Sequence, residues 1–469
     1  MKIKKNLAIL GLGLLGTSLA LALKKNSAWH IMGYARNAET RNWVSENGIV
    51  DEIYDTPEAI LKKADLAVLC MPVSAAVKML PLCAENLPPS AVITDIGSVK
   101  MEIIDAAAEF PQMHFVGSHP MAGTEKSGCK AAFAGLYQNA DVFVVPGRNS
   151  TPDDAELCRR MWLDAGCARA EEIDAVRHDE LVADTSHVLH LLASALTLSI
   201  LDAPDAEEQR KHFAGCATGF RDTTRIASSN PAMWRGIMES NRDAVLAAVK
   251  RFEKRFIEMK KTIENGDFDS FEELFSTGKL LRNAWLGYKR PRPARLLLCG
   301  IKHCGKSSTG KILAELLPAQ FADSDDEIVR LYKERTSKSL TVRQLYRQLG
   351  EEDFRKLERD ALAQLAERQG AMAVSLGGGA LSNPFVTDEL LHKLGEVIWL
   401  DIPDNIAWER VKANGIPPFL ANADDPEAEF YRTNTARKEV FARCAKWVIQ
   451  PEPGDTPQRV ALRILGALD

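Results

Sequence analysis

The chain has 469 residues, of which 46% are hydrophobic and 26% charged, a composition that indicates a globular protein of several domains. Lys and Arg number 59 against 64 Asp and Glu, so no basic excess points to nucleic acid as a partner. Nine scattered cysteines without a C-x-x-C pair predict reduced thiols in a cytoplasmic protein. The apolar run at 7–10 is broken by glycines, and the run at 188–201 is short and carries polar residues, so no targeting segment and no membrane partner are expected.

From the start to residue 147, short apolar runs alternate with helical patterns. The predicted strands are 7–10, 30–34, 66–71, 91–96 and 115–117, and stretches such as 16–25 and 73–85 are predicted helices. This alternation predicts a parallel sheet with helices on both faces. The turn-rich run from Pro146 to Pro152 places the end of this domain at residue 147.

Residues 148–288 are predicted to be mostly helical, because apolar residues recur at helical spacing. The clearest example is the series Val245, Val249, Phe252, Phe256, Met259 and Ile263. Two prolines and three cations at 289–293 then predict a linker over 289–294. Residues 295–469 again alternate strand and helix, beginning with a buried strand from Arg295 to Cys299.

A glycine-rich loop follows the first predicted strand. Gly11, Gly13 and Gly16 form G-x-G-x-x-G, with Leu14 and Leu15 opening a helix, and this context predicts a dinucleotide pyrophosphate at the helix N-terminus. At the end of the second strand, Ala35 stands where NAD sites usually have an acidic residue, and the next residue, Arg36, could pair with a 2'-phosphate. NADP, or either dinucleotide without strong preference, is therefore the expected cofactor, unless Arg36 is only a solvated loop cation.

Two loops at strand ends carry candidate catalytic groups. Residues 95–100 read Asp-Ile-Gly-Ser-Val-Lys, and residues 117–128 read Gly-Ser-His-Pro-Met-Ala-Gly-Thr-Glu-Lys-Ser-Gly. His119, followed by a proline in a glycine-rich loop, is suited to accept a proton near neutral pH.

These residues resemble the prephenate/arogenate dehydrogenase family. The resemblance covers about residues 5–285 and rests on five motifs: GLGLLG at 11, DIGSVK at 95, SHPMAGTEKSG at 118, HDELVADTSHVLH at 178 and FRDTTRIASSNPAMWR at 220. It implies a nucleotide-binding domain followed by a helical dimerisation domain, and hence a homodimer. It also implies that the substrate is prephenate, favoured here by the HPMAGTEKSG form, or arogenate.

The resemblance also implies roles for single residues. His119 would take the proton from the ring hydroxyl, Ser98 would support that hydroxyl, and Glu125 would lie near the pocket entrance. His187 and His190 would be the paired histidines of the helical domain, with Asp179 upstream, and Arg225 would clamp a substrate carboxylate. Core histidines and surface arginines are the competing interpretation.

A second anion-binding loop follows the strand at 295–299. Residues 300–307 read G-x-x-x-x-G-K-S, which predicts a loop that holds the phosphates of ATP, with Lys306 on the outer phosphates and Ser307 on Mg²⁺. The predicted nucleotide-binding residues are Gly300, Cys304, Gly305, Lys306, Ser307 and Ser308.

From residue 295 to about 450 the chain resembles shikimate kinase. This implies Asp323 near Mg²⁺, Asp325 on substrate hydroxyls as the base, and Arg355 and Arg437 on the shikimate carboxylate, with Glu358 in support. Gly377, Gly378 and Gly379 would let the backbone approach the substrate. Two departures put transfer in doubt, His303 in the phosphate loop and Pro417 at the position of the lid arginine, for which Arg410 or Lys412 are possible substitutes.

The expected fold is therefore α/β, with a Rossmann-type dinucleotide-binding domain, an all-helical dimerisation domain and a P-loop kinase domain. The expected function is bifunctional: oxidative decarboxylation of prephenate to 4-hydroxyphenylpyruvate, and phosphorylation of shikimate. The alternatives are an arogenate-using dehydrogenase with a degenerate, ATP-sensing kinase-like domain, and a dehydrogenase of a different small hydroxy acid.

Overall fold

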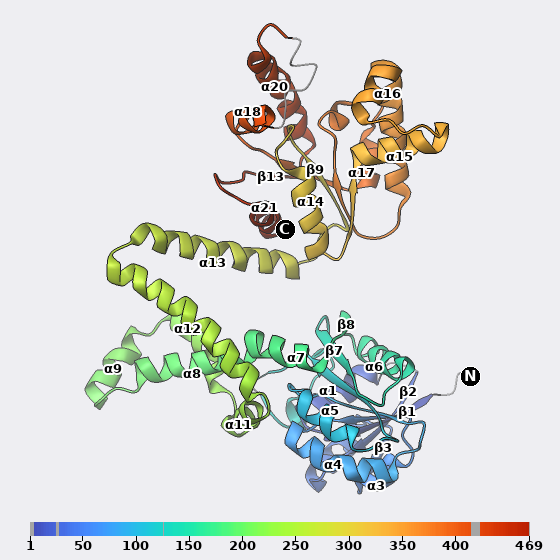
Figure 1. Cartoon of the computed structure of the whole chain (residues 1–469). Coiled ribbons are helices and arrows are strands. Elements are labelled where there is room, and N and C mark those ends of the chain that lie inside the picture. Colours follow the sequence, from blue (N-terminus) through green and yellow to red (C-terminus); the bar gives the residue numbers. More distant parts are fainter. Residues whose placement is uncertain (1–3, 25–27, 125, 414–422, 469) are drawn as a thin grey trace. The chain divides into compact units, whose positions relative to one another are not determined.

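The computed structural model describes residues 4–24, 28–124, 126–413 and 423–468, and the chain divides into two compact units, residues 1–258 and 259–469 (Figure 1). The first unit contains an eight-stranded sheet in the order β3-β2-β1-β4-β5-β6-β7-β8. Its strands are β1 (Lys5–Leu10), β2 (Trp29–Tyr34), β3 (Glu52–Tyr54), β4 (Leu66–Leu69), β5 (Val92–Asp95), β6 (His114–Pro120), β7 (Asp141–Pro146) and β8 (Arg169–Glu172).

Helices cover both faces of this sheet, as the strand sequences require. Along β1, Leu7 and Ile9 belong to one apolar cluster, whereas Ala8 and Leu10 belong to another, because successive side chains of a strand point to opposite faces. The helices of this part are α1 (Leu14–Leu23), α2 (Ala38–Glu46), α3 (Pro57–Leu61), α4 (Val73–Asn86), α5 (Met101–Ala108) and α6 (Pro152–Asp164).

The five strands predicted in this region are confirmed as β1, β2, β4, β5 and β6. The prediction of a parallel sheet was wrong for one pair of strands, because β6 and β7 run antiparallel. The sheet also continues beyond residue 147 through α6 and β8. Only Ala170 of β8 is buried, so its sequence, Arg-Ala-Glu-Glu, has no apolar run. Apolar periodicity therefore did not predict this strand.

The rest of the first unit is helical, as predicted. It comprises α7 (Ala175–Val182), a π-helical turn (Ala183–His187), α8 (Val188–Leu201), α9 (Ala206–Gly215), α10 (Thr218–Thr224), α11 (Pro231–Ser240) and α12 (Arg242–Asn265), which runs on past residue 258. Its own core is small and centres on Ala183, Val188, Val245 and Ala248. By length and composition alone the continuous helix at residues 175–201 is able to cross a membrane, and 28% of its most apolar window is buried.

The second unit is a five-stranded parallel sheet in the order β10-β11-β9-β12-β13. Its strands are β9 (Arg295–Cys299), as predicted, β10 (Gln320–Asp323), β11 (Met372–Ser375), β12 (Glu396–Leu400) and β13 (Trp447–Ile449). Its helices are α13 (Phe268–Lys289), α14 (Lys306–Leu316), α15 (Ser324–Thr336), α16 (Val342–Glu367), α17 (Asp388–Leu394), α18 (Asp404–Ala413), α20 (Pro426–Cys444) and α21 (Pro457–Ala467).

Candidate active sites

The loop between β1 and α1 has the geometry of a dinucleotide cradle. Gly11 has a φ of +109°, and a Cβ there would lie 2.3 Å from the Cys70 carbonyl oxygen. A Cβ on Gly16 would lie 2.1 Å from the Gly11 carbonyl oxygen, so this glycine lets α1 pack on the loop. A Cβ on Gly13 would have no atom of another described residue within 4 Å, its chain neighbours aside. Among the residues that the structure describes, no side chain caps the N-terminus of α1. Its amides are thus available to the pyrophosphate of a dinucleotide.

A buried polar network lies under the loop that follows β5. Lys100 and Asp95, both almost fully buried, form an ion pair. Lys100 Nζ donates to the Ser118 carbonyl oxygen at 2.9 Å, and the Ser118 amide donates to Asp95 Oδ1 at 3.2 Å. Thr94 Oγ1 lies 2.8 Å from Ser118 Oγ. These bonds fix the backbone of β6 immediately before His119.

His119 stands at the end of a chain of three side chains. Its Nδ1 lies 2.9 Å from His178 Nε2, and His178 Nδ1 lies 2.7 Å from Asp179 Oδ1. The Asp179 carboxylate also accepts the amides of Lys100 and Met101, at 2.8 and 2.9 Å, where α5 begins. A carboxylate only accepts, so His178 donates from Nδ1 and accepts at Nε2. His119 therefore donates from Nδ1, and its Nε2 is left with a free lone pair.

Both histidines of this chain favour the neutral form. Burial, with smaller contributions from neighbouring His178 and Lys100, holds the pKa of His119 well below its usual range. Burial also lowers the pKa of His178, although the neighbouring Asp179 opposes the shift. A neutral His119 with an open Nε2 has the form of a general base.

A second cluster lies on the helices that follow. Asn241 Nδ2 donates to the Asp179 carbonyl oxygen at 2.8 Å and lies 3.2 Å from His187 Nδ1, which ties the first cluster to the π-helical turn. The rings of His190 and Trp234 stack with their centroids 3.8 Å apart. His187 Nε2 and Trp234 Nε1 are buried and make no hydrogen bond within the described residues. Burial lowers the pKa of His187 to about 4.

The other residues predicted for the first site lie at different places relative to His119. Burial lowers the pKa of His190, and the bond to the Ser186 carbonyl oxygen opposes this shift. Arg225, exposed in the turn after α10, lies close enough to His190 to lower the pKa further. His187 is fully buried, its Nδ1 lies 3.2 Å from Asn241 Nδ2, and its charge contributes to the lowered pKa of His119. Ser98 lies in the loop between Asp95 and Lys100. Glu125 lies outside the described residues.

Sequence analysis missed three residues that build this site, Asp95, Lys100 and His178. Asp95 and Lys100 belong to the DIGSVK motif, but their buried ion pair forms only in the folded chain and has no local signal in the sequence. His178 opens the HDELVADTSHVLH motif, but nothing local in the sequence places its ring against His119, 59 positions earlier.

The phosphate loop of the second unit is also well formed. Gly300 and Gly305 have φ values of +147° and +99°, and no side chain caps the N-terminus of α14. Lys306 Nζ donates to the carbonyl oxygens of Gly300 and Ile301, at 3.0 and 3.1 Å. Ser307 Oγ donates to Asp323 Oδ2 at 2.6 Å. A hydroxyl and a carboxylate oxygen at the mouth of a phosphate loop are ligands that Mg²⁺ prefers.

Three charged side chains converge on the triple-glycine loop after β11. A Cβ on Gly377 would lie 2.7 Å from Asp325 Oδ1, one on Gly378 3.6 Å from Arg437 Nη1, and one on Gly379 2.7 Å from Arg355 Nη1. A side chain at Gly377 or Gly379 would therefore collide with Asp325 or Arg355, whereas one at Gly378 would only contact Arg437. Arg355 is held by Glu358 at 2.7 Å, which in turn accepts from Asn383 at 2.9 Å.

Burial and neighbouring charges shift the pKa values of the side chains around this loop. The pKa of Asp325 is raised to about 6 because protein atoms surround the carboxyl group and because Asp323 and Glu358 add negative charge. The pKa of Arg437 is lowered, first by burial and then by Arg355. Lys302, which sequence analysis did not single out, has a lowered pKa through burial and the nearby Arg343. Arg355 and Arg437 lie near each other at this loop, and two guanidinium groups can clamp a substrate carboxylate.

The two departures from the kinase pattern have different outcomes. His303 adopts a φ of +63°, the left-handed conformation that glycine favours, so the loop keeps its path with a larger side chain. Its carbonyl oxygen accepts from Arg410 at 3.2 Å, and Lys412 pairs with Glu409 at 2.6 Å. Pro417, at the lid position, lies outside the described residues.

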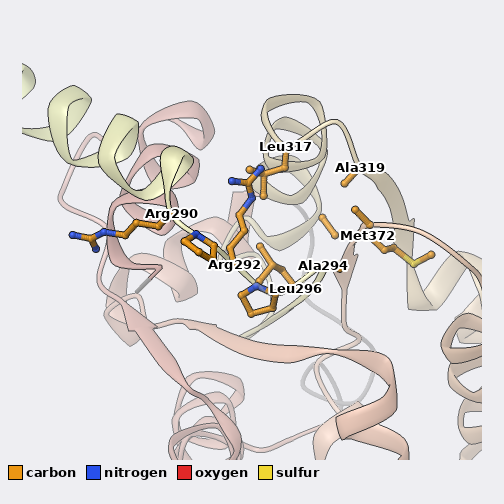
Figure 2. A pocket seen from close by; sticks show the side chains of 11 residues that line it. Arg290, Arg292, Ala294, Leu296, Leu317, Ala319 and Met372 are labelled. Carbon is orange, nitrogen blue, oxygen red and sulfur yellow. The ribbon is translucent and has the colours of Figure 1, made fainter. Parts of the chain in front are cut away.

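A hollow of about 330 Å³ lies elsewhere in the second unit (Figure 2). It is lined by residues 290–294 and by the beginnings of β9 and β11. Parallel sheets of this type bind ligands at the carboxyl ends of their strands, and the hollow is at the opposite ends. The hollow is therefore separate from the site at the phosphate loop.

Comparison with known proteins agrees with both sites. Residues 19–172 match the family model "Prephenate dehydrogenase, nucleotide-binding domain", residues 174–277 match "Prephenate dehydrogenase, dimerization domain" and residues 302–469 match "Shikimate kinase". The chain is 34% identical to a prephenate dehydrogenase of Lactococcus lactis over 294 residues, which are 62% of this chain and 80% of that protein. It is 36% identical to a shikimate kinase of Rhizobium meliloti over 147 residues, 31% of this chain and 72% of that protein.

A solved prephenate dehydrogenase from A. aeolicus, in complex with hydroxyphenyl propionate and NAD⁺, has a TM-score of 0.56 and 30% identity to this chain, over 60% of this chain and 98% of that one. The relay, the two loops and these matches lead to one conclusion. The chain belongs to the prephenate dehydrogenase family in its first part and to the shikimate kinase family in its last part, and it is a fused, bifunctional enzyme of aromatic biosynthesis.

Proposed function

We propose that the first unit oxidises prephenate with NADP or NAD to 4-hydroxyphenylpyruvate and CO₂. The observation that carries this proposal is the chain from Asp179 through His178 to His119, which leaves a neutral imidazole nitrogen open at the end of β6. A ring alcohol that loses hydride needs such a base for its hydroxyl proton.

In this mechanism, His119 Nε2 takes the hydroxyl proton as the carbinol carbon gives up its hydride. The bound dinucleotide supplies the hydride acceptor. The bond from the ring to the carboxylate then breaks, its electron pair makes the ring aromatic, CO₂ leaves, and the proton returns to the phenolic oxygen. His178 and Asp179 hold the base in the correct tautomer, while Ser98 supports the hydroxyl and Arg225 binds a carboxylate.

We propose that the second unit transfers the γ-phosphoryl group of ATP to the 3-hydroxyl of shikimate. Asp325 accepts the hydroxyl proton, Arg355 and Arg437 bind the carboxylate, and Lys306 neutralises the charge that develops on the phosphates. Mg²⁺ would be held by Ser307 and, near it, Asp323. The convergence of Asp325, Arg355 and Arg437 on three glycines is the observation that favours a working kinase over a degenerate one.

A dual assay on the purified full chain tests both proposals. Reduced dinucleotide should form with prephenate, and ADP should form only when shikimate is added. Arogenate, offered in place of prephenate, separates the two dehydrogenase substrates. ADP formation that does not depend on shikimate would leave the kinase proposal without support.

The cofactor preference depends on Arg36. It is exposed, and its side chain makes no hydrogen bond or ion pair within residues 4–24 and 28–124, whereas Arg41 is held by the Ala35 and Arg36 carbonyls. A 2'-phosphate would gain a charge-assisted bond there. Arg36→Ala is expected to lower kcat/KM for NADP about tenfold and leave kcat/KM for NAD unchanged. Steady-state rates with both dinucleotides check this, and a strong NAD preference of the unmodified enzyme would contradict it.

The pH dependence of the dehydrogenase follows from the lowered pKa of His119. A base with a lowered pKa stays neutral at pH values where free histidine, with a pKa of about 6.5, would be half protonated. Hence kcat/KM for prephenate should stay level down to about pH 6.5 and fall only below it. A pH–rate profile measures this, and a decline that begins above that value would show that the base is not shielded as described.

We further propose a cytoplasmic homodimer. Large apolar side chains on the helices of the first unit are exposed, among them Leu189, Leu198, Met233, Leu246 and Phe256. A second copy that covers them would account for both this exposure and the apolar helix at residues 175–201. All nine cysteines are free thiols, as expected in a reducing compartment. Sedimentation analysis should give twice the chain mass of 51.7 kDa.

A further inference from the structure

Helix α13 precedes the segment that matches shikimate kinase, yet it is packed into the core of the second unit. Ala284 is 3% exposed and belongs to the same apolar cluster as Leu297 of β9 and Leu465 of α21. Arg459 of α21 donates to Thr277 Oγ1 of α13 at 3.4 Å. Helix α21 therefore covers one face of α13 from Thr277 to Ala284.

Two glycines allow an unusually close contact between these helices. A Cβ on Gly287 would lie 1.7 Å from the Leu465 carbonyl oxygen, and one on Gly466 would lie 3.2 Å from the Asn283 Cβ. The backbones of α13 and α21 thus touch directly at the end of α13. Gly278, on the same helix, has nothing within 4 Å of the equivalent position.

The contact continues to the phosphate loop. Helix α21 packs against α14 as well as α13. Leu313 of α14 and Ile464 of α21 lie fully buried in the same cluster as Ala284. Helix α14 begins at Lys306, the lysine of the phosphate loop. The three helices therefore form a continuous layer from α13 to the nucleotide site.

The segment expected to be a linker, residues 289–294, is also attached to this unit. Arg292 Nη1 donates to the Tyr288 carbonyl oxygen at 2.6 Å in the last turn of α13, and its guanidinium lies 5.2 Å from the Tyr288 ring centre. The Met372 amide donates to the Ala294 carbonyl oxygen at 2.9 Å, where the sheet begins. Figure 2 shows Arg292 and Ala294 beside Leu296 and Met372. These bonds hold the end of α13 against the sheet.

We infer that α13 is a structural helix of the kinase, which holds α21 and, through it, the phosphate-loop helix in position. The family match to the kinase begins only at residue 302, and the match to the dehydrogenase dimerisation domain extends to residue 277, inside α13. The kinase of this chain thus depends on a helix that begins within the dehydrogenase segment. Gly287 is a positioning residue, because its surroundings are the backbone of Leu465 and Gly466 and not the phosphate loop.

The test compares Gly287→Ala with Gly278→Ala in the full chain. Alanine favours helix over glycine at both positions, but only at residue 287 does the new methyl group meet a backbone carbonyl. Gly287→Ala should lower the unfolding midpoint of the kinase unit by about 5 °C. It should also raise KM for ATP more than KM for shikimate and speed hydrogen exchange in α21 and α14, with dehydrogenase kcat and KM unchanged. Gly278→Ala should cause none of these losses.

The result that overturns the inference is equal behaviour of the two variants, or a loss in the dehydrogenase while the kinase is intact. If Gly287→Ala is insoluble, Ala284→Ser, which puts a hydroxyl into the apolar core, should give the same pattern in a milder form. The inference rests on the proposed kinase activity for its KM readout only. The unfolding midpoint and hydrogen exchange need no activity, and ADP formation by the unmodified chain tests the activity itself.

Discussion

Asn in place of His119 is expected to lower kcat of the dehydrogenase reaction by about 10²- to 10⁴-fold, the range for loss of a general base. The Asn amide can still donate a hydrogen bond to His178 Nε2, as His119 does, but it does not take up a proton. Binding of prephenate depends on other groups, so KM should change much less than kcat. The acid limb of the pH–rate profile should disappear with the base.

His114→Asn is the matched control, because it makes the same substitution on the same strand, β6, outside the site. His114 pairs with Asp154 at 2.8 Å, and the side chain is one-third exposed. Its loss should leave kcat within about twofold of the unmodified enzyme, because the bond from His114 to Asp154 lies outside the network around His119. Initial rates of dinucleotide reduction measure both variants. Equal rates for His119→Asn and His114→Asn would exclude His119 as the base.

The fold was largely predictable because its strands are fully buried. A strand such as β1, apolar on both faces, gives a continuous apolar run followed by a glycine loop, and both phosphate-binding loops lie after such strands. The edge strand β8 buries only Ala170, so it has no apolar run that would reveal it. The neighbouring β7 does have a mostly buried apolar run at 142–145, but its antiparallel direction depends on its pairing with β6 and not on its own residues.

The candidate sites were predictable as motifs but not as geometries. The resemblance named His119 and Arg225, yet the residue that bonds to His119 is His178, 59 positions away in the sequence. The ion pair between Lys100 and Asp95 cannot be predicted from the sequence, because both charges are removed from water only when the chain folds. In the same way, the role of Gly287 depends on a helix that comes 178 residues after it, at Leu465, and no local pattern contains that contact.

Asn in place of Asp325 is expected to lower kcat of shikimate phosphorylation by about 10²- to 10⁴-fold, because the substrate hydroxyl loses its proton acceptor. The pKa of Asp325, raised to about 6, places the acid limb of the kinase profile near that pH in the unmodified enzyme. Above that pH the carboxyl group is ionised and able to act as base. The Asn variant should lack this limb.

The stability of the same variant separates lost chemistry from lost structure. A carboxyl group whose folded pKa is raised stabilises the fold only at low pH, and that contribution is lost as pH rises through about 6. At pH 7 the Asn variant should therefore unfold at the same temperature as the unmodified chain or above it, while its kinase rate collapses. Asp326→Asn, the next residue in the first turn of α15, is the matched control and should keep the rate. A lowered unfolding midpoint in Asp325→Asn would mean that this carboxylate holds the fold together, and the assignment of Asp325 as the base would fail.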